Sequence, residues 1–226
     1  MPRVAAVIFD FDGVLADTER LHLAAFQEVF GLRGWTLDER TYFDRYLGCD
    51  DEGLVEAFAR DHALALAEDD RTTLVEAKTQ AFSQHLSSGA VLFPAARACV
   101  TSLAETFRLG IASGALRSEI ESILHAGGLL QYFPVIVGAD DVEECKPSPV
   151  PYLTAASKLG IDPSSCVAIE DSAPGLAAAH AAGMRTIALT TTSPRTLLAG
   201  ADHIIDSLDE LSALVKNTSG VFLRKT

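Results

Sequence analysis

Two aspartates near the start of the chain carry the first sign of chemistry. Asp10 and Asp12 directly follow an apolar run, in the segment AAVIFDFD. In extended backbone, side chains two residues apart point the same way, so the two carboxylates are predicted to lie close together. Adjacent carboxylates repel unless a cation offsets their charge, and such hard oxygen ligands favour Mg²⁺. The pair alone is also consistent with a solvated turn after a strand, so the interpretation depends on its partners.

Suitable partners follow in three segments farther along the chain. Ser113 ends the apolar run LGIAS, and Glu170 and Asp171 end the run CVAIED. Lys146 precedes Pro147, which disfavours a helix and predicts extended, fixed backbone. In an open α/β sheet, the carboxyl ends of the strands border the ligand crevice. A carboxylate cluster, a hydroxyl and a cation are thus predicted to converge at one edge of a sheet.

Such a set is suited to phosphoryl transfer. Asp10 could attack phosphorus and form an aspartyl phosphate. Asp12 could protonate the leaving oxygen and later deprotonate the attacking water. Ser113 would bind a phosphoryl oxygen, unless it only caps a strand end, and Lys146 would stabilise the charge that develops in transfer. The predicted catalytic residues are Asp10, Asp12, Ser113 and Lys146.

A magnesium ion would offset the negative charge that remains. Asp171 would supply a ligand from a neighbouring strand end, and Glu170 would either contact the ion or orient waters around it. The cofactor is therefore predicted to be Mg²⁺, and the predicted metal-site residues are Asp10, Asp12, Glu170 and Asp171.

A parallel sheet must position these residues. Short apolar runs that alternate with helical stretches are typical of βα units with strands buried on both faces. The predicted strands are 4–9, 109–112, 135–137, 167–169, 186–189 and 203–205. The predicted helices between them are 95–106, 117–126, 150–159, 175–182, 194–199 and 208–215. Right-handed crossovers then give a doubly wound, Rossmann-like α/β core.

Residues 18–88 interrupt this alternation, because they contain amphipathic helical patterns and no convincing buried strand. They are predicted to form an inserted all-helical cap domain, with residues 1–17 and 89–226 forming the core. Helices are predicted at 21–30, ending at Gly31, from an Asp50 cap to about His62, and at 70–86. Helical lids of this kind can close over a site and exclude water.

Composition excludes several classes of function. The chain has 226 residues, of which 48% are hydrophobic and 22% charged, as expected for a packed globular enzyme. Its net charge of −13 leaves no broad basic face for nucleic acid or an anionic membrane. The first apolar run is too short and too acidic for a signal peptide, and no run approaches the ~18 residues of a membrane span. We therefore expect a cytoplasmic protein, and a monomer.

The four cysteines are widely spaced and show no CxxC pairing. This spacing favours reduced thiols over a zinc site or a disulfide framework. The four are Cys49, Cys99, Cys145 and Cys166.

Four segments in order, DFDGVLADT, LGIASG, KPSPVPY and IEDSAPG, resemble the motifs of the haloacid dehalogenase superfamily. The Asp-x-Asp form resembles its phosphatases and phosphomutases, and the helical insertion is similar to the cap of its β-phosphoglucomutase-like subgroup. The resemblance implies that Mg²⁺ is bound by Asp10, the backbone carbonyl of Asp12, and Asp171. It also implies that the cap supplies substrate specificity.

Candidate substrate-binding residues are less sharply defined. Thr18 and His22 match the T-x-x-x-H of that subgroup, which implies a hinge residue and a residue that helps to position Asp12. Each also has a purely structural interpretation: Thr18 as a helix cap and His22 as a residue on a helix face. Gly114 directly follows the motif serine. Four charged residues are further candidates, with solvated surface charge as the alternative for each: Arg45, Lys78, His85 and Arg117.

The predicted function is a Mg²⁺-dependent phosphatase acting on a small phosphorylated metabolite, plausibly a sugar phosphate. A β-phosphoglucomutase-like mutase is the alternative. Mutases carry an arginine in the cap loop, where this chain has the acidic stretch 48–52, and they follow the motif serine with polar and cationic residues, where it has Gly114, Ala115 and Leu116. A receiver-like phosphoacceptor module is a remote third interpretation.

Overall fold

A computed structural model describes residues 3–46, 49–86 and 91–217. The chain divides into two compact units. The core unit comprises Met1–Asp17 and Leu92–Thr226, and the helical unit comprises Thr18–Val91. The predicted insertion also begins at residue 18, whereas its predicted end, residue 88, lies outside the described residues.

The core unit is built on a parallel sheet. Within the described residues the sheet has six strands in the order β3-β2-β1-β4-β5-β6, and every neighbouring pair is parallel. β1 lies in the middle, where Phe9 pairs with Ile111 on one side and Ile169 on the other. The strands are β1 (Ala6–Phe9), β2 (Arg108–Ala112), β3 (Val135–Val137), β4 (Cys166–Glu170), β5 (Arg185–Leu189) and β6 (His203–Ile205). Each predicted strand is present.

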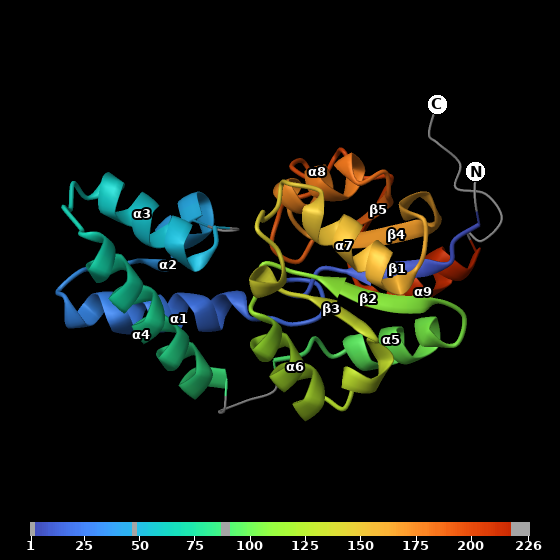
Figure 1. Cartoon of the computed structure of the whole chain (residues 1–226), viewed down its shortest axis with the longest axis horizontal. Helices are drawn as coiled ribbons and strands as arrows, with labels where there is room; N and C mark the ends of the chain where they lie inside the picture. The colour runs from blue at the N-terminus through green and yellow to red at the C-terminus, as the bar shows by residue number, and fades with distance from the viewer. Residues whose placement is uncertain (1–2, 47–48, 87–90, 218–226) are drawn as a thin grey trace. The chain divides into compact units, whose positions relative to one another are not determined.

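Helices cover both faces of this sheet (Figure 1). α7 (Val150–Leu159) and α8 (Ala173–Ala181) pack on one face, and α5 (Ala96–Ala104) and α9 (Leu208–Asn217) pack together on the other. α6 (Arg117–Ala126) follows β2, and short 3-10 turns, η2 (Leu130–Tyr132), η3 (Ala139–Asp141) and η4 (Pro163–Ser165), complete the connections. The predicted doubly wound α/β fold is thus confirmed.

Burial on both faces explains why the strands are almost entirely apolar. Ala6 and Ile8 of β1 belong to one core cluster with Tyr152 and Ala156 of α7. Val7 and Phe9 alternate with them and are also inaccessible to solvent. Apart from Thr186 within β5, the polar side chains of the strands lie at strand ends, and the candidate site lies at the carboxyl ends.

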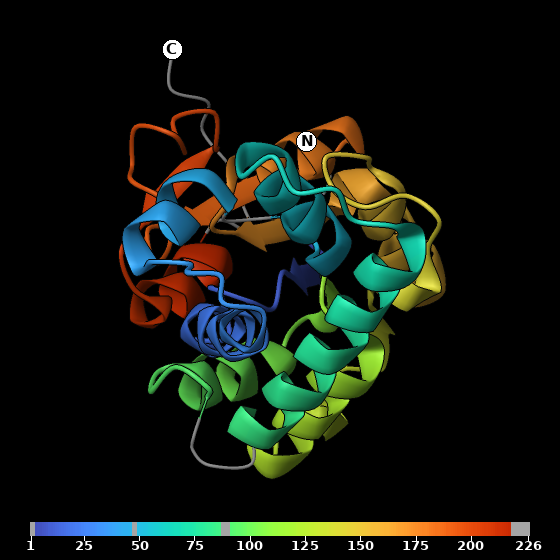
Figure 2. The same cartoon turned by 90° about the vertical axis from the view of Figure 1, so that its left-hand side faces the viewer.

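The helical unit has its own core. Its helices are α1 (Glu19–Leu32), α2 (Glu39–Thr41), the π-helix η1 (Tyr42–Tyr46), α3 (Asp51–Asp61) and α4 (Glu68–Leu86). Figure 2 looks almost along the axis of α1, which packs against α4, and α4 also packs against α3. The buried core contains Phe26, Phe30 and Phe58, and Trp35 packs on the last two. Among the helices of the described ranges, none is long and apolar enough to cross a membrane.

The predicted helix bounds agree with the structure in one case and differ in two. Asp50 caps α3 as predicted, since its side chain accepts the Gly53 N–H at 2.7 Å. The predicted end of α1 at Gly31 is wrong: the helix continues to Leu32, and Gly34 takes the left-handed conformation that ends the turn, with φ +74°. The predicted helix at 194–199 is also wrong, because those residues form turns.

The cysteines differ in exposure. Cys99 in α5 and Cys166 in β4 are buried, and burial raises the pKa of each thiol to about 11. Cys49 in the helical unit and Cys145 in the core unit are exposed.

Candidate active site

The site is assembled at the carboxyl ends of three strands of the core unit. Asp10 follows β1, Ser113 follows β2, and Glu170 ends β4. The Asp10 N–H continues the sheet by donating to the Ile169 carbonyl at 2.9 Å, and the Ser113 N–H donates to Val137 at 3.0 Å. Regular sheet hydrogen bonds thus fix the backbone of these residues.

Lys146 joins two of the carboxylates. Its Nζ lies 2.9 Å from Asp10 Oδ1 and 2.6 Å from Glu170 Oε1. Burial opposes the charge on Lys146, but Asp10 and Glu170 together raise its pKa above the ordinary value, so it stays protonated. Its backbone is a turn with a cis peptide bond to Pro147, rather than the predicted extended segment.

Three buried carboxylates form a cluster around this lysine. Asp10, Glu170 and Asp171 each present an oxygen within 4.8 Å of the others. Burial raises the pKa of Asp10 to about 7, against the lowering effect of Lys146. Burial, Asp10 and Glu170 also raise the pKa of Asp171 well above its ordinary value. One lysine does not neutralise three carboxylates, so the cluster is suited to a cation bound by oxygen.

Both oxygens of Glu170 are already occupied by protein donors. Oε1 accepts from Lys146 at 2.6 Å and from the Tyr152 hydroxyl at 2.7 Å. Oε2 accepts from the Ser172 hydroxyl at 2.9 Å and from the N–H groups of Asp171 and Ser172. Gly175 permits this arrangement, because a Cβ there would overlap the carboxylate. Both oxygens of Glu170 thus have protein donors, which favours its predicted orienting role over direct contact with a metal ion.

The loop after β1 orients Asp12. Its turn is closed by N–H groups of Leu15 and Ala16 that donate to the Phe11 carbonyl, at 2.9 and 3.1 Å. Gly13 has φ +71°, and a Cβ there would overlap Asp171, so this position requires glycine. The Asp12 carboxylate accepts from Ser113 Oγ at 3.4 Å. It thus faces Ser113 while its charge still raises the pKa of Asp10.

Sequence reasoning missed three side chains at this edge. Thr192 donates to the Asp171 carboxylate and Thr191 to the Gly13 carbonyl. Both belong to the run of threonines that begins directly after β5, but they lie two and three residues past its end, so the rule that led to Ser113 did not single them out. Tyr152 lies within the segment KPSPVPY, but nothing in the local pattern distinguishes it from an ordinary core aromatic.

The other core-unit candidates differ in their surroundings. Gly114 is exposed, directly after Ser113. Arg117 is held by Asp141 at 3.0 Å and by the Ile136 carbonyl, and Glu121 lies 3.6 Å from it. Its guanidinium thus has a structural role, and no contact links it to the carboxylate cluster within the described residues.

Three predicted site residues belong to the helical unit. Thr18 is buried at the N-cap position of α1. Lys78 is buried rather than solvated, and its Nζ lies 2.7 Å from His22 Nδ1 and 2.7 Å from the Asp51 carboxylate. Burial and Lys78 lower the pKa of His22 well below its ordinary value, which leaves a neutral ring that can accept the bond.

Arg45 and His85 of the helical unit also have acidic neighbours. Arg45 pairs with Asp61 at 2.9 Å, and His85 Nε2 lies 3.1 Å from Glu28. Both side chains remain partly exposed, as the surface interpretation predicts.

The chain is similar in sequence and structure to known hydrolases. The haloacid dehalogenase-like hydrolase family matches residues 7–189. Protein CbbY of Rhodobacter capsulatus is 34% identical over 195 residues, covering 80% of this chain and 83% of that protein. Hexitol phosphatase B of Escherichia coli (strain K12) is 32% identical, covering 93% and 96%. A solved structure of CbbY from Rhodobacter sphaeroides, in complex with xylulose-(1,5)-bisphosphate, matches with a TM-score of 0.84 and 32% identity, covering 92% and 96%.

Proposed function

This chain belongs to the haloacid dehalogenase-like hydrolases, and on that premise we propose that it is a Mg²⁺-dependent phosphatase of a small phosphorylated metabolite. The observation that carries the proposal is the position of Asp10. It is a buried carboxylate at the end of the central strand, held by Lys146 at 2.9 Å within a cluster of three carboxylates. A receiver-like module has no need of the helical unit, and membership of the hydrolase family speaks against it.

Asp10 acts as the nucleophile. Its Oδ1 accepts from the Phe11 N–H at 2.7 Å and from Lys146, so the plane of the carboxylate is fixed. Attack on phosphorus forms a bond from Asp10 to the phosphoryl group and breaks the bond to the leaving oxygen. Lys146 remains charged at this position and stabilises the negative charge of the transferred group.

Asp12 moves the protons. It gives a proton to the leaving oxygen and then takes one from the water that hydrolyses the aspartyl phosphate. Ser113 holds the Asp12 carboxylate from one side and lies where its hydroxyl could also bind a phosphoryl oxygen. Because Asp12 is partly exposed whereas Asp10 is buried, substrate and water reach the two carboxylates from the Asp12 side.

Mg²⁺ would be held by Asp10 and Asp171, with Glu170 and Thr192 orienting these groups. The fit rests on the chemistry of the donors, which are hard oxygens in a buried cluster with excess negative charge. When bound, the ion would offset the charge of the carboxylates and of the substrate phosphate.

The substrate is proposed to be a sugar phosphate. Two relatives with full-length similarity support this class, since one is named a hexitol phosphatase and the other was solved with a sugar bisphosphate. The mutase alternative is weaker. Gly48 lies outside the described residues, but Asp50 caps α3 and Asp51 pairs with Lys78, so two of the three acids of that stretch have structural partners.

A panel of sugar and nucleotide phosphates tests the proposal. We expect phosphate release from at least one sugar phosphate with Mg²⁺, and none with a chelator. Mutase activity is tested separately with β-glucose 1-phosphate and a trace of the bisphosphate. Formation of glucose 6-phosphate without matching phosphate release would reject the phosphatase.

We further propose a cytoplasmic monomer, in keeping with the acidic composition. Light scattering after size exclusion would report a mass near 24.0 kDa for the monomer.

A further inference from the structure

A buried tyrosine donates a hydrogen bond to one carboxylate of the cluster. Tyr152 lies on α7, is fully inaccessible to solvent, and donates its hydroxyl to Glu170 Oε1 at 2.7 Å. Burial and the charge of Glu170 raise the pKa of Tyr152 well above its ordinary value, so the hydroxyl is a neutral donor.

The same tyrosine also contacts Lys146. The Lys146 ammonium lies 5.1 Å from the centre of the Tyr152 ring, within the range of a cation–π interaction. Tyr152 thus engages both members of the Lys146–Glu170 pair, one through its hydroxyl and the other through its ring. Within the described residues its hydroxyl bonds Glu170 and not Asp10, so it acts on the nucleophile through Glu170 and Lys146.

We propose that Tyr152 is a positioning residue that sets how Lys146 divides its charge between Glu170 and Asp10. Glu170 Oε1 is shared by two donors, Lys146 at 2.6 Å and Tyr152 at 2.7 Å. Because the tyrosine hydroxyl supplies one of the two hydrogen bonds that Glu170 Oε1 accepts, Lys146 can also bond Asp10, at 2.9 Å. Without the hydroxyl, Glu170 draws Lys146 toward itself and away from the reacting oxygen.

This inference rests on the proposed function, because it assigns a role in the same reaction. Tyr152→Phe is the test, since it removes only the hydroxyl and keeps the ring over Lys146. We expect kcat and kcat/KM to fall together by about tenfold or more, with KM unchanged, as for other residues that orient a reacting group. The assays are run with Mg²⁺ well below the melting temperature of each variant.

Thr186→Val is the matched control. Thr186 is also fully buried in the core unit and bonds His180 at 2.9 Å and the Asp202 carboxylate at 3.4 Å, but neither belongs to the carboxylate cluster. We expect this variant to lower the melting temperature and to leave kcat within twofold of the unmodified chain. It separates the general cost of deleting a buried hydroxyl from an effect on Lys146.

Two results would reject the positioning role. If Tyr152→Phe lowers the melting temperature but keeps kcat within twofold, the hydroxyl is only structural. If Tyr152→Phe and Thr186→Val lose kcat equally, the loss is general. Failure of the unmodified chain to hydrolyse any phosphate ester with Mg²⁺ would instead reject the proposed function, and the positioning role with it.

Discussion

Lys78 of the helical unit is buried and Lys146 of the core unit is largely shielded from solvent, but the two lysines have opposite surroundings. Lys146 of the core unit lies between Asp10 and Glu170, with Asp171 in the same cluster. Lys78 of the helical unit faces one carboxylate, Asp51, at 2.7 Å. The charge around Lys146 is thus net negative, whereas Lys78 and Asp51 balance each other.

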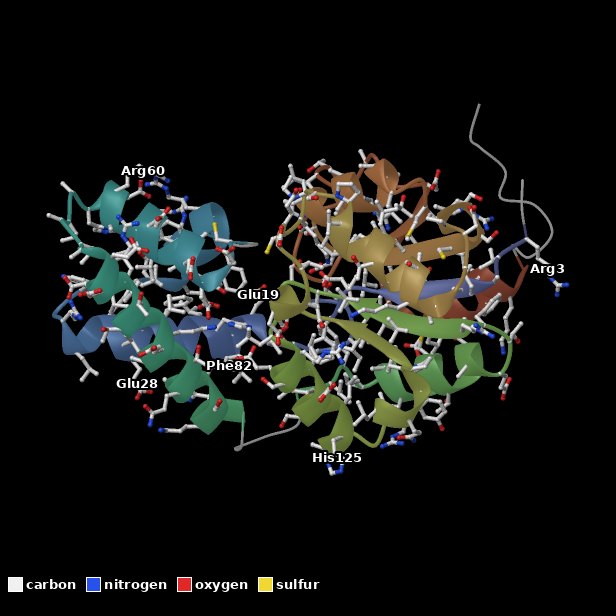
Figure 3. All side chains as sticks on the ribbon, in the orientation of Figure 1. Arg3, Glu19, Glu28, Arg60, Phe82 and His125 are labelled. Atoms are coloured by element: carbon white, nitrogen blue, oxygen red, sulfur yellow. The ribbon has the colours of Figure 1, made fainter. Side chains whose placement is uncertain are left out.

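The other neighbours of Lys78 confirm that it is neutralised locally. His22 is a neutral acceptor, and the ammonium lies 5.3 and 5.0 Å from the ring centres of Phe26 and Phe82. Phe82, labelled in Figure 3, extends from α4 toward α1 and stacks on His22 with centroids 4.3 Å apart. Burial of a lysine therefore does not identify a reactive site. The sum of charge around it does.

The largest expected effect comes from removing the nucleophile. Asp10→Asn should lower kcat on the order of 10⁴-fold or more, because no other group can accept the phosphoryl group. The melting temperature should not fall, since one of the crowded carboxylates is removed. Circular dichroism and steady-state kinetics measure both. Asp162→Asn, which can still cap η4 before β4, is the control and should keep full activity.

Removing Lys146 should have the next largest effect. Lys146→Met should lower kcat about 10³-fold, because a donor aimed at developing charge is lost. Lys146→Arg should restore little, since a planar guanidinium does not reproduce a single ammonium between two carboxylates. Kinetics of both variants on the best substrate decide this. Activity of Lys146→Met near that of the unmodified chain would remove the lysine from the mechanism.

Lys78 should matter chiefly for stability. Lys78→Met leaves Asp51 unpaired and should lower the unfolding free energy of the helical unit by about 3 kcal/mol. Trp35, the one tryptophan of the chain, lies in this unit, so urea unfolding followed by its fluorescence reports the change. The double variant Lys78→Met, Asp51→Leu should recover part of the loss. Equal stability of both variants would show that the pair is not coupled.

Mg²⁺ should stabilise only the unit with the uncompensated acids. At a hundred times its dissociation constant, a ligand that binds only the folded state adds about 2.7 kcal/mol to the free energy of unfolding. Calorimetry should show this gain, and a chelator should reverse it. Asp171→Asn should reduce the gain, and Asp162→Asn should not. The unfolding transition reported by Trp35 should stay in place, and a shift of that transition would contradict the distinction.

The smallest effect concerns the pH dependence of the helical unit. His22 has a folded-state pKa below the ordinary 6.5, so the unfolded chain binds the proton more tightly. The contribution of neutral His22 to the free energy of unfolding is therefore fully present above about pH 6.5. It falls as pH decreases, by at most about 1.4 kcal/mol per pH unit. His22→Asn keeps an acceptor for Lys78 and removes the titration. Urea unfolding of both proteins above and below that pH should show a flatter profile for the variant.

The positions of Asp10, Ser113 and Glu170 could be predicted because a parallel sheet brings the carboxyl ends of its strands to one edge. That rule needs only the apolar runs and the residue after each. Thr192 lies three residues after the end of β5, so that rule did not single it out.

The partners of Lys78 could not be predicted in the same way. Lys78 is buried because α1 supplies His22 and α3 supplies Asp51, from 56 and 27 residues away. The alternative of solvated surface charge for Lys78 rested only on the usual exposure of lysine side chains. Tyr152 was missed for the same reason, since its partner Glu170 is on another element. Such contacts depend on packing between helices and strands, which no local pattern contains.

The distribution of the thiols allows each unit to be labelled separately. Cys49 and Cys145 are exposed, one in each unit, whereas Cys99 and Cys166 are buried. Burial raises the pKa of Cys99 and Cys166 to about 11 and also raises the pKa of Cys49. Thiol-directed labels should therefore react first at the two exposed positions. The chain without any substitution would then carry one spectroscopic probe on each unit. Their separation, recorded with and without phosphate, would report whether the distance between the two labels changes.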